Sequence, residues 1–333
     1  MATDAELVHL IETEILGEMR YSGAEVAARA GIVFETAERL WVEVGFLPID
    51  RDEPAFSEAD IEALLSLKTL QEVRDVSTES VLGMARVLGQ ALSRVAASQI
   101  EVTLERFLIS DGVRVPEVGT PEGKELRIGI ELSMAVSEGF ITYVWRRHLA
   151  AALRRQLDPR KTEVVGFVDL VGYTRLTTQL DEEELPALLT RFQHIATSNV
   201  ATYGGQVVKL IGDAVMFNAP DAPSAARAAL GIRHALREEE TVPRVRIGLA
   251  VGPVVRVEGD VYGDTVNRAS RLAELARPDA ILVDDAMGAE LFDEGEFTVR
   301  QLRPRRLRGI GLVRSWSLRE PRRRGGEDEM EAE

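Results

Sequence analysis

Hydrophobic residues recur every three or four positions through most of the first half of the chain, and this spacing predicts amphipathic helices. The first run starts at Glu6, and Gly31 ends one of the short helices that follow. Longer runs cover residues 77–108 and 125–157, and a proline-containing break follows at 158–160. The first half is therefore predicted to be all-helical, with 125–157 as a connecting helix.

After residue 161 the pattern changes to short apolar runs, typical of buried strands, that alternate with helical segments. The predicted elements are, in order, a strand at 164–170, a helix at 182–203, a hairpin of 206–210 and 214–217, a helix at 222–239, a long strand at 245–257, a helix at 266–276 and a strand at 281–283. This order predicts an α+β fold of the ferredoxin-like or palm type, an antiparallel sheet with helices on one face. The chain is thus divided into a helical domain at 1–157, an α+β domain at 158–320 and a charged tail at 321–333 that is expected to be disordered.

Residues 21–70 show the order of a small winged-helix unit. A short helix ends at Gly31, a second helix follows around 38–41, and a third begins near Phe56. This order resembles the winged-helix regulators of the MerR kind, and a small helical bundle with a glycine turn gives the same pattern. Residues 1–110 carry 20 acidic and 9 basic side chains, a net charge of −11, which would repel nucleic acid and anionic membranes. We therefore expect no nucleic-acid partner.

The composition is that of a soluble globular protein with room for two domains: 333 residues, of which 45% are hydrophobic and 29% charged. No stretch reaches the roughly 18 uninterrupted apolar residues of a membrane span. The start of the chain lacks the basic and then apolar pattern of a secretory signal. The absence of cysteine excludes disulfides, thiolate metal ligands and a cysteine nucleophile. We expect a cytoplasmic location and no integral membrane association.

Two carboxylates occupy positions next to apolar strands. Asp169 ends the apolar run 164–168, and Asp213 lies at the tip of the predicted hairpin. In a palm sheet the first strand and this hairpin are neighbours, so the two carboxylates are expected to meet at one edge. Paired carboxylates repel one another unless a cation joins them, and Mg²⁺ and Mn²⁺ prefer oxygen ligands. Taken alone, an aspartate at a strand end or in a turn is more often structural.

A glycine turn directly follows the first of these carboxylates. Gly172, Tyr173 and Thr174 form it, and free backbone N–H groups in such a turn are able to bind phosphate. We therefore treat these three residues as candidate phosphate-binding positions.

Two further motifs complete a specific pattern. Lys209 lies four residues before the second carboxylate, and residues 259–271 read Gly-Asp-Val-Tyr-Gly-Asp-Thr-Val-Asn-Arg-Ala-Ser-Arg. With all motifs in this order and spacing, residues 163–318 resemble the catalytic domain of a class III nucleotide cyclase.

The resemblance implies roles for the residues at matching positions. Asp169, Asp213 and the backbone of Leu170 are expected to bind two divalent metal ions, Mg²⁺ or Mn²⁺. Lys209 and Asp260 match the pair that recognises adenine. Lysine only donates hydrogen bonds and ionised aspartate only accepts them, which complements N1 and N6 of adenine. Guanine presents the opposite polarity, so the pair favours ATP over GTP.

The last motif matches the residues that act on the ribose and the transition state. Asn267 and Arg271 lie one helical turn apart, so they share a helix face, and a guanidinium suits the charge that develops on the α-phosphoryl oxygens. Arg308 matches a triphosphate-contacting lysine only loosely, and a solvated basic stretch explains it as well. The implied reaction is attack of the ribose 3′-hydroxyl on the α-phosphorus of ATP, giving 3′,5′-cyclic AMP and pyrophosphate by a two-metal mechanism.

The resemblance also implies a homodimer. In this family one site takes its metal-binding and base-binding residues from different subunits, and this single chain carries the complete set. Two equivalent sites on a twofold axis are therefore expected, with an inactive monomer.

The order of the two halves resembles that of actinobacterial two-domain adenylyl cyclases, in which the N-terminal domain restrains catalysis in a pH-dependent way. Some of that group are linked to fatty-acid binding, so pH or a small apolar ligand is the implied signal for residues 1–157. His148, beside Arg146 and Arg147, is a candidate sensor because histidine titrates near neutrality, and a solvated histidine is the alternative. We expect helix 125–157 to transmit the signal.

Two other functions stay open. A guanylyl cyclase would share the fold, although GTP-specific relatives carry glutamate and cysteine or similar residues in place of Lys209 and Asp260. A transcription regulator with a degenerate, nucleotide-sensing cyclase domain is the alternative outside the enzymes. The complete metal and transition-state set and the acidic first half count against it. The Gly-Gly-Asp/Glu-Glu-Phe motif of a diguanylate cyclase is absent.

Overall fold

The computed structural model describes residues 12–13, 15–46, 50–104, 108–109, 112–113, 120–157, 162–181, 184–239, 241–307 and 311–320. The chain divides into two compact units, Met1–Leu157 and Asp158–Glu333, and each is described by itself. The predicted helical run at Glu6 and the tail at 321–333 lie outside the described residues.

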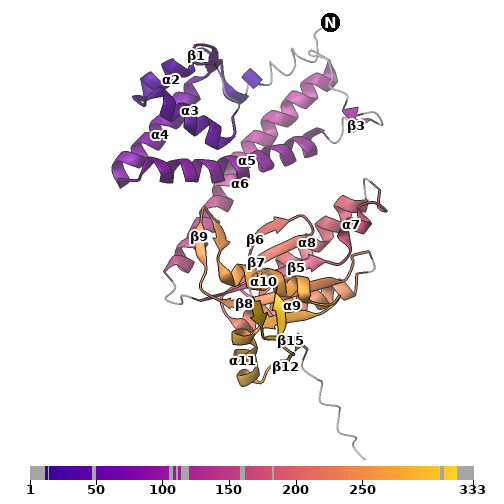
Figure 1. Cartoon of the computed structure of the whole chain (residues 1–333). Helices are drawn as coiled ribbons and strands as arrows, with labels where there is room; N and C mark the ends of the chain where they lie inside the picture. The colour runs from indigo at the N-terminus through magenta and orange to yellow at the C-terminus, as the bar shows by residue number, and fades with distance from the viewer. Residues whose placement is uncertain are drawn as a thin grey trace, which may run out of the picture. The chain divides into compact units, whose positions relative to one another are not determined.

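The N-terminal unit consists mainly of helices, as its hydrophobic spacing predicts (Figure 1). Its elements are β1 (Tyr21–Ser22), α2 (Gly23–Ala30), α3 (Phe34–Val44), β2 (Pro54–Phe56), α4 (Glu58–Arg74), α5 (Thr78–Leu104), β3 (Leu108–Ile109), β4 (Gly112–Val113) and α6 (Pro121–Gln156). The connecting helix α6 begins one turn before its predicted start, because the Thr120 hydroxyl caps it by accepting from the Gly123 N–H at 3.1 Å. No helix among the described residues of the chain is long and apolar enough to cross a membrane.

A helix–turn–helix lies near the start of this unit. Ser22 caps α2 through reciprocal hydrogen bonds with Glu25, and Gly31 ends the helix in the left-handed conformation, with φ at 64°. β1 pairs with β2 in the antiparallel sense, and Trp41 stacks on Phe56 with ring centres 4.3 Å apart. The short helix, glycine turn and second helix are present as predicted, and the likeness to MerR regulators stays a prediction.

The C-terminal unit is an α+β domain, as predicted. Its elements are β5 (Glu163–Leu170), α7 (Tyr173–Leu176), α8 (Glu184–Thr202), β6 (Gln206–Ile211), β7 (Ala214–Ala219), α9 (Ala222–Arg237), β8 (Val245–Gly252), β9 (Val255–Val257), β10 (Asp260–Tyr262), α10 (Asp264–Leu275), β11 (Ile281–Asp284), α11 (Asp285–Glu294), β12 (Thr298–Gln301), β13 (Arg305–Leu307), β14 (Gly311–Val313) and β15 (Ser315–Arg319). Seven of the strands form one sheet in the order β12-β15-β11-β8-β5-β7-β6. β8 and β11 run parallel and the other neighbours antiparallel, so the sheet is mixed.

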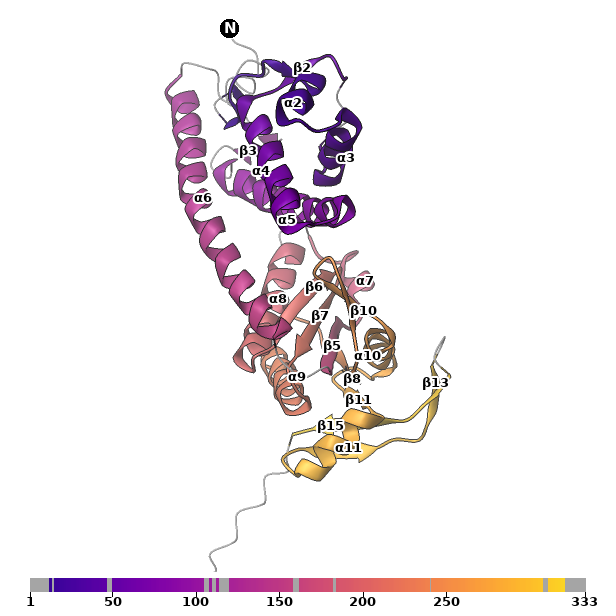
Figure 2. The ribbon, with the colours of Figure 1, turned by 90° about the vertical axis from the view of Figure 1, so that its left-hand side faces the viewer.

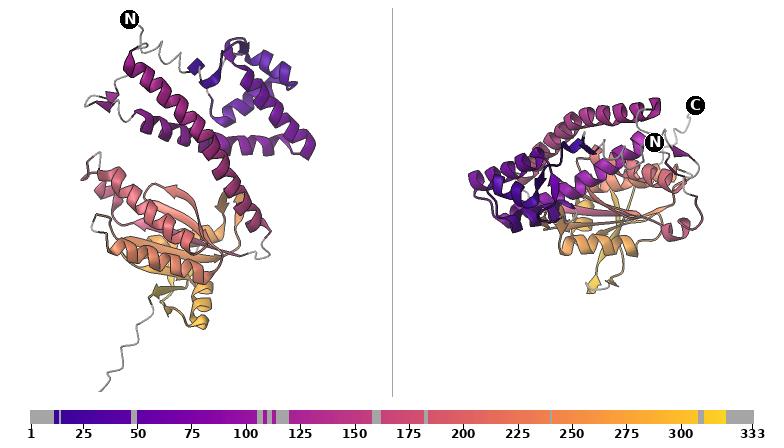
Figure 3. Two further views of the ribbon diagram at one scale, coloured as in Figure 1. Left: turned by 180° about the vertical axis from the view of Figure 1, so that it is seen from behind. Right: turned by 90° about the horizontal axis from the view of Figure 1, so that it is seen from above.

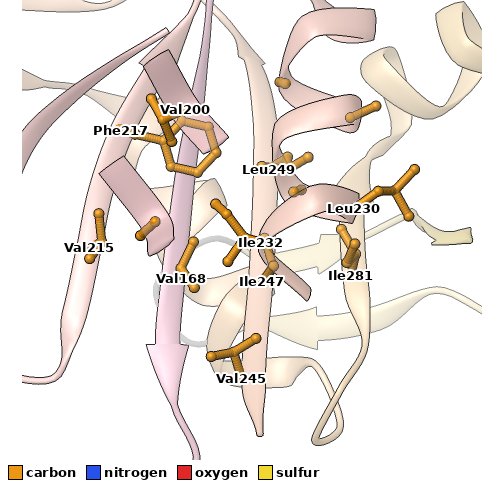
Figure 4. Close-up of a cluster of buried hydrophobic side chains, with 14 of the residues drawn as sticks. Val168, Val200, Val215, Phe217, Leu230, Ile232, Val245, Ile247, Leu249 and Ile281 are labelled. Carbon is orange, nitrogen blue, oxygen red and sulfur yellow. The ribbon is translucent and has the colours of Figure 1, made fainter. Parts of the chain in front are cut away.

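Helices cover both faces of this sheet, which corrects the predicted one-sided arrangement (Figure 2). α8 and α9 lie side by side on one face (Figure 3), over a core that includes Val168 and Phe217 (Figure 4). On the other face, Phe167 and Met216 cluster with Ala269 of α10. Because successive side chains of a strand point to opposite faces, a strand covered on both faces is apolar at consecutive positions, as at 164–168 of β5 and 214–217 of β7. This explains the continuous apolar runs in the sequence.

The predicted long strand at 245–257 is in fact two strands. β8 ends at Gly252, and Pro253, which has no N–H to donate to a sheet, separates it from β9. β9 pairs with β10 in a separate two-stranded hairpin. The proline was therefore a readable signal for the end of the sheet strand.

Candidate active site

The first sheet strand and the β6–β7 hairpin bring two carboxylates to one edge of the sheet. Asp169 lies near the end of β5, opposite Ala214 of β7, and Asp213 lies in the turn between β6 and β7. The N–H of Leu170 donates to the backbone oxygen of Asp213 at 3.2 Å, which holds the turn against the end of β5. The structure thus places the two aspartates together, as the palm arrangement predicts.

Asp169 is half-buried and forms an ion pair with Arg246, which lies opposite it on β8. Burial raises the pKa of Asp169, the ion pair with Arg246 opposes that rise, and the negative charge of Asp213 adds to it. A cation shared by the two aspartates would remove this repulsion. Arg246 was missed by the sequence analysis, and its signal was a lone arginine within an apolar strand.

The ligand set at this edge fits a hard divalent cation. Asp169 and Asp213 offer carboxylate oxygens and Leu170 a backbone carbonyl, and oxygen is the ligand atom that Mg²⁺ and Mn²⁺ prefer. Within the ranges that the structure describes, no group of three or more His, Cys, Asp or Glu side chains is placed to hold a metal. Water and substrate phosphate would therefore complete the coordination, as is usual for Mg²⁺.

The glycine turn after β5 has an irregular backbone. Gly172 adopts a φ of 77°, which favours glycine, and precedes the four-residue helix α7. The first N–H groups of such a helix have no partner within it. Tyr173 packs against the core and Thr174 is exposed. Phosphate binding at this turn stays a prediction, and Arg308, the other predicted phosphate contact, lies outside the described residues.

The predicted adenine pair is formed within one chain. Lys209 of β6 makes an ion pair with Asp260 of β10, and the N–H of Val261 donates to the other carboxylate oxygen at 2.7 Å. Burial acts to raise the pKa of Asp260, but the hydrogen bonds from Lys209, the Val261 N–H and Tyr262 outweigh it and hold this pKa below its ordinary value. Asp260 is therefore an ionised acceptor at neutral pH.

Tyr262 is a neighbour of this pair that the sequence analysis did not select. The Lys209 ammonium lies 5.5 Å from the centre of its ring, within cation–π distance. Tyr262 lies two residues after Asp260 on a strand, so both side chains are on the same strand face, and this spacing was the available signal.

The two remaining candidates lie on α10. Asn267 is exposed, and the side chain of Arg271 is 40% exposed. Nη1 of Arg271 donates to both carboxylate oxygens of Glu274, at 2.6 and 2.7 Å. One nitrogen of the guanidinium is thus held by its own helix, and the side chain remains partly accessible.

The candidate residues form three separate pairs in one chain: Asp169 with Asp213, Lys209 with Asp260, and Asn267 with Arg271. Among the described residues, no hydrogen bond or ion pair joins the first pair to the third. The first and third pairs are connected only indirectly among these residues. Arg246, the ion-pair partner of Asp169, donates from Nη1 to the backbone oxygen of Glu274 at 3.4 Å, and the side chain of Glu274 holds Arg271.

The candidate sensor lies in the N-terminal unit. His148 is on α6 and its side chain is exposed, as are the neighbouring Arg146 and Arg147. Its role in sensing pH stays a prediction.

Comparisons with known proteins match both halves of the chain to domains of adenylate cyclases. Residues 158–320 match the family described as adenylate and guanylate cyclase catalytic domain, and residues 1–125 match the adenylate cyclase regulatory domain. An adenylate cyclase of Streptomyces coelicolor is 37% identical over 350 residues, covering 95% of this chain and 90% of the relative. An adenylate cyclase of Streptomyces griseus is 39% identical over 302 residues, covering 88% and 74%. A protein of Mycobacterium tuberculosis named pH-sensitive adenylate cyclase is 29% identical over 319 residues, covering 92% and 79%.

These matches extend over most of this chain and most of each relative. The chain therefore belongs to the class III adenylate cyclases in which a regulatory domain precedes the catalytic domain.

Proposed function

We propose that this chain converts ATP into 3′,5′-cyclic AMP and pyrophosphate. The observation that carries the proposal is the Lys209–Asp260 pair, in which a cationic donor and an ionised acceptor lie together. Adenine complements this pair, whereas guanine would place donor against donor and acceptor against acceptor. Two relatives named adenylate cyclase support the same choice. Incubation of the full-length protein with ATP and with GTP, followed by quantification of both cyclic nucleotides, tests it.

The proposed reaction is an in-line displacement at the α-phosphorus. The ribose 3′-hydroxyl gives its proton to water and its oxygen forms the new bond to the α-phosphorus. The bond from the α-phosphorus to the bridging oxygen breaks, and pyrophosphate leaves with that oxygen. Two divalent metals held by Asp169 and Asp213 would lower the pKa of the 3′-hydroxyl and offset phosphate charge. Asn267 orients the ribose, and Arg271 receives the charge that grows on the α-phosphoryl oxygens.

The active enzyme is proposed to be a homodimer with two sites. Each chain offers a carboxylate pair and an α10 pair that make no direct contact with one another among the described residues. A twofold axis would let the carboxylate pair of one subunit face the α10 pair of its partner, and the reverse at the second site.

The preference for ATP over GTP is expected to be constant between about pH 5 and about pH 8. The pKa of Asp260 is lowered, so the carboxylate keeps its charge as the pH falls through this range and accepts a proton only in stronger acid. The ratio of kcat/KM for ATP to kcat/KM for GTP, measured at steps across the range, checks this. A ratio that collapses toward the acidic end would show that Asp260 does not recognise the base in its ionised form.

Regulation by pH is proposed for residues 1–157. The match of residues 1–125 to the regulatory domain and the relative named pH-sensitive support it. His148 is an accessible titratable group on the helix that ends this unit. A fatty acid or another small apolar ligand for the same residues, and a cytoplasmic location, stay predictions.

Removing residues 1–158 is expected to flatten the pH–activity profile. If the N-terminal unit carries the sensor, the full-length protein changes activity several-fold between about pH 5.5 and about pH 8, and the truncated form changes far less. His148→Ala in the full-length protein is expected to reduce the same response. His194→Ala, at an exposed histidine of α8, is the matched control. Unchanged profiles in both the truncated form and His148→Ala would refute this regulation.

A further inference from the structure

Arg268 stands between the two candidate catalytic residues of α10, yet its own contacts are with the body of the catalytic unit. Its Nη2 donates to the backbone oxygen of Val251 at 3.2 Å, and its Nε lies 3.3 Å from a carboxylate oxygen of Asp284. A further ion pair joins it to Asp264, one turn earlier on the same helix. One guanidinium thus connects α10 with the end of β8 and with the junction of β11 and α11.

The partner carboxylate is buried and held in place. The side chain of Asp284 is 5% exposed. It caps α11 by accepting from the N–H of Met287 at 3.1 Å, and it accepts from the N–H of Val251 at 3.5 Å. Burial raises the pKa of Asp284, while these bonds and the charge of Arg268 oppose the rise. A nearby cation stabilises the ionised form of a buried carboxylate, so the fixed Asp284 favours the observed position of the Arg268 guanidinium.

These contacts of Arg268 are directional, whereas much of the interface between α10 and the sheet is apolar packing. At Gly248 of β8 a Cβ would lie 2.2 Å from the backbone nitrogen of Ala273, so the helix rests directly on the strand there. Such close packing sets the distance between helix and sheet, and the buried apolar residues of α10 set its approximate rotation about its axis. The buried Thr265 hydroxyl donates to the backbone oxygen of Pro253 at 2.8 Å, a further directional contact of the same helix.

We propose that Arg268 and Asp284 form a positioning pair, which sets the rotation of α10 and thereby directs Asn267 and Arg271 at the substrate. The inference rests on the proposed cyclase function. Asn267 and Arg271 act at the reacting centre, so a small rotation of α10 would weaken transition-state contacts more than ground-state binding. Loss of the pair therefore lowers kcat and leaves the KM for ATP nearly unchanged.

Three variants of the full-length protein test the pair. Arg268→Met removes the charge and the hydrogen bonds, Arg268→Lys keeps the charge without the planar donors, and Asp284→Ser keeps an oxygen that is able to cap α11. We expect Arg268→Met and Asp284→Ser to lower kcat about tenfold to about a hundredfold, with KM changed less than about twofold. Arg268→Lys is expected to retain an intermediate kcat. The control is Arg227→Met, which breaks the exposed ion pair with Glu296 in the same unit and is expected to leave kcat unchanged.

A second readout does not depend on catalysis. Amide hydrogen exchange in the peptide 264–275 is expected to be faster in Arg268→Met and in Asp284→Ser than in the wild type or Arg227→Met. The double variant is expected to lose no more kcat than the worse single variant, because both remove the same contact.

Several results would overturn the inference. An unchanged kcat in Arg268→Met, or an equal loss in Arg227→Met, would show that the pair has no specific effect on catalysis. A raised KM with an unchanged kcat would show that Arg268 contacts substrate instead of positioning α10. A wild type that forms no cyclic AMP would refute the proposed function, and hydrogen exchange would then still decide whether the pair holds α10. Failure of the proposed cyclase function and failure of the positioning pair are therefore distinguishable.

Discussion

Replacing Asp213 by alanine is expected to reduce cyclic AMP formation to background. A bound divalent metal contributes several kcal/mol of transition-state stabilisation, and each 1.4 kcal/mol or so corresponds to tenfold in rate, so a loss of about 10³-fold or more is expected. Asp169→Ala is expected to have the same effect. Asp293→Ala, at an exposed carboxylate of α11, is the matched control and is expected to keep full activity. The measurement is initial rate at saturating ATP with Mg²⁺ or Mn²⁺.

Asp213→Ala also tests whether each active site is shared between two subunits. Arg271→Ala is also expected to be inactive, but a mixture with Asp213→Ala is expected to regain activity. If subunits exchange freely, half of the dimers are mixed, and one of the two sites in each mixed dimer is intact. About a quarter of the wild-type activity should therefore return. A mixture as inactive as its two parents would show that each site is built within a single chain.

Exchanging both members of the adenine pair is expected to reverse the nucleotide preference. Glutamate in place of Lys209 accepts from the N1–H of guanine, and cysteine in place of Asp260 removes the acceptor that repels its O6. Since a site built for one hydrogen-bond pattern strongly rejects the other, the ratio of kcat/KM for ATP and GTP should change by about 10³-fold or more in Lys209→Glu/Asp260→Cys.

The single variant separates recognition from general damage. Lys209→Glu alone is expected to lose activity with ATP without gaining full activity with GTP, because Asp260 still faces the guanine oxygen. Melting temperatures of both variants should remain close to that of the wild type, since the pair is partly exposed. A double variant that folds and still prefers ATP would refute the assigned role of the pair.

The features that the sequence predicted well are local ones. The place of Asp169 at the end of an apolar run, the turn around Asp213 and the one-turn spacing of Asn267 and Arg271 depend only on neighbouring residues. The order of strands and helices could also be predicted from the sequence, because the spacing of hydrophobic residues changes where a strand ends and a helix begins. The α+β fold and the helical first half followed from that period.

The features that the sequence did not predict depend on register between distant strands. Arg246 meets Asp169 only because β5 and β8 align in one particular register, and Arg268 meets Asp284 only because α10 crosses the end of β8. No pattern along the chain specifies either contact. The position of α10 on the opposite face has the same origin, since an amphipathic helix does not indicate which face of a two-sided sheet it covers.

The proposed cyclase function is tested most directly by the formation of cyclic AMP from ATP, compared with cyclic GMP from GTP, by the full-length wild type and by Asp213→Ala in the presence of Mn²⁺ or Mg²⁺. The wild type is expected to make cyclic AMP far faster than cyclic GMP, and Asp213→Ala is expected to make neither above background. A wild type without cyclic nucleotide synthesis under either metal, or an Asp213→Ala variant as active as the wild type, would refute the proposed function.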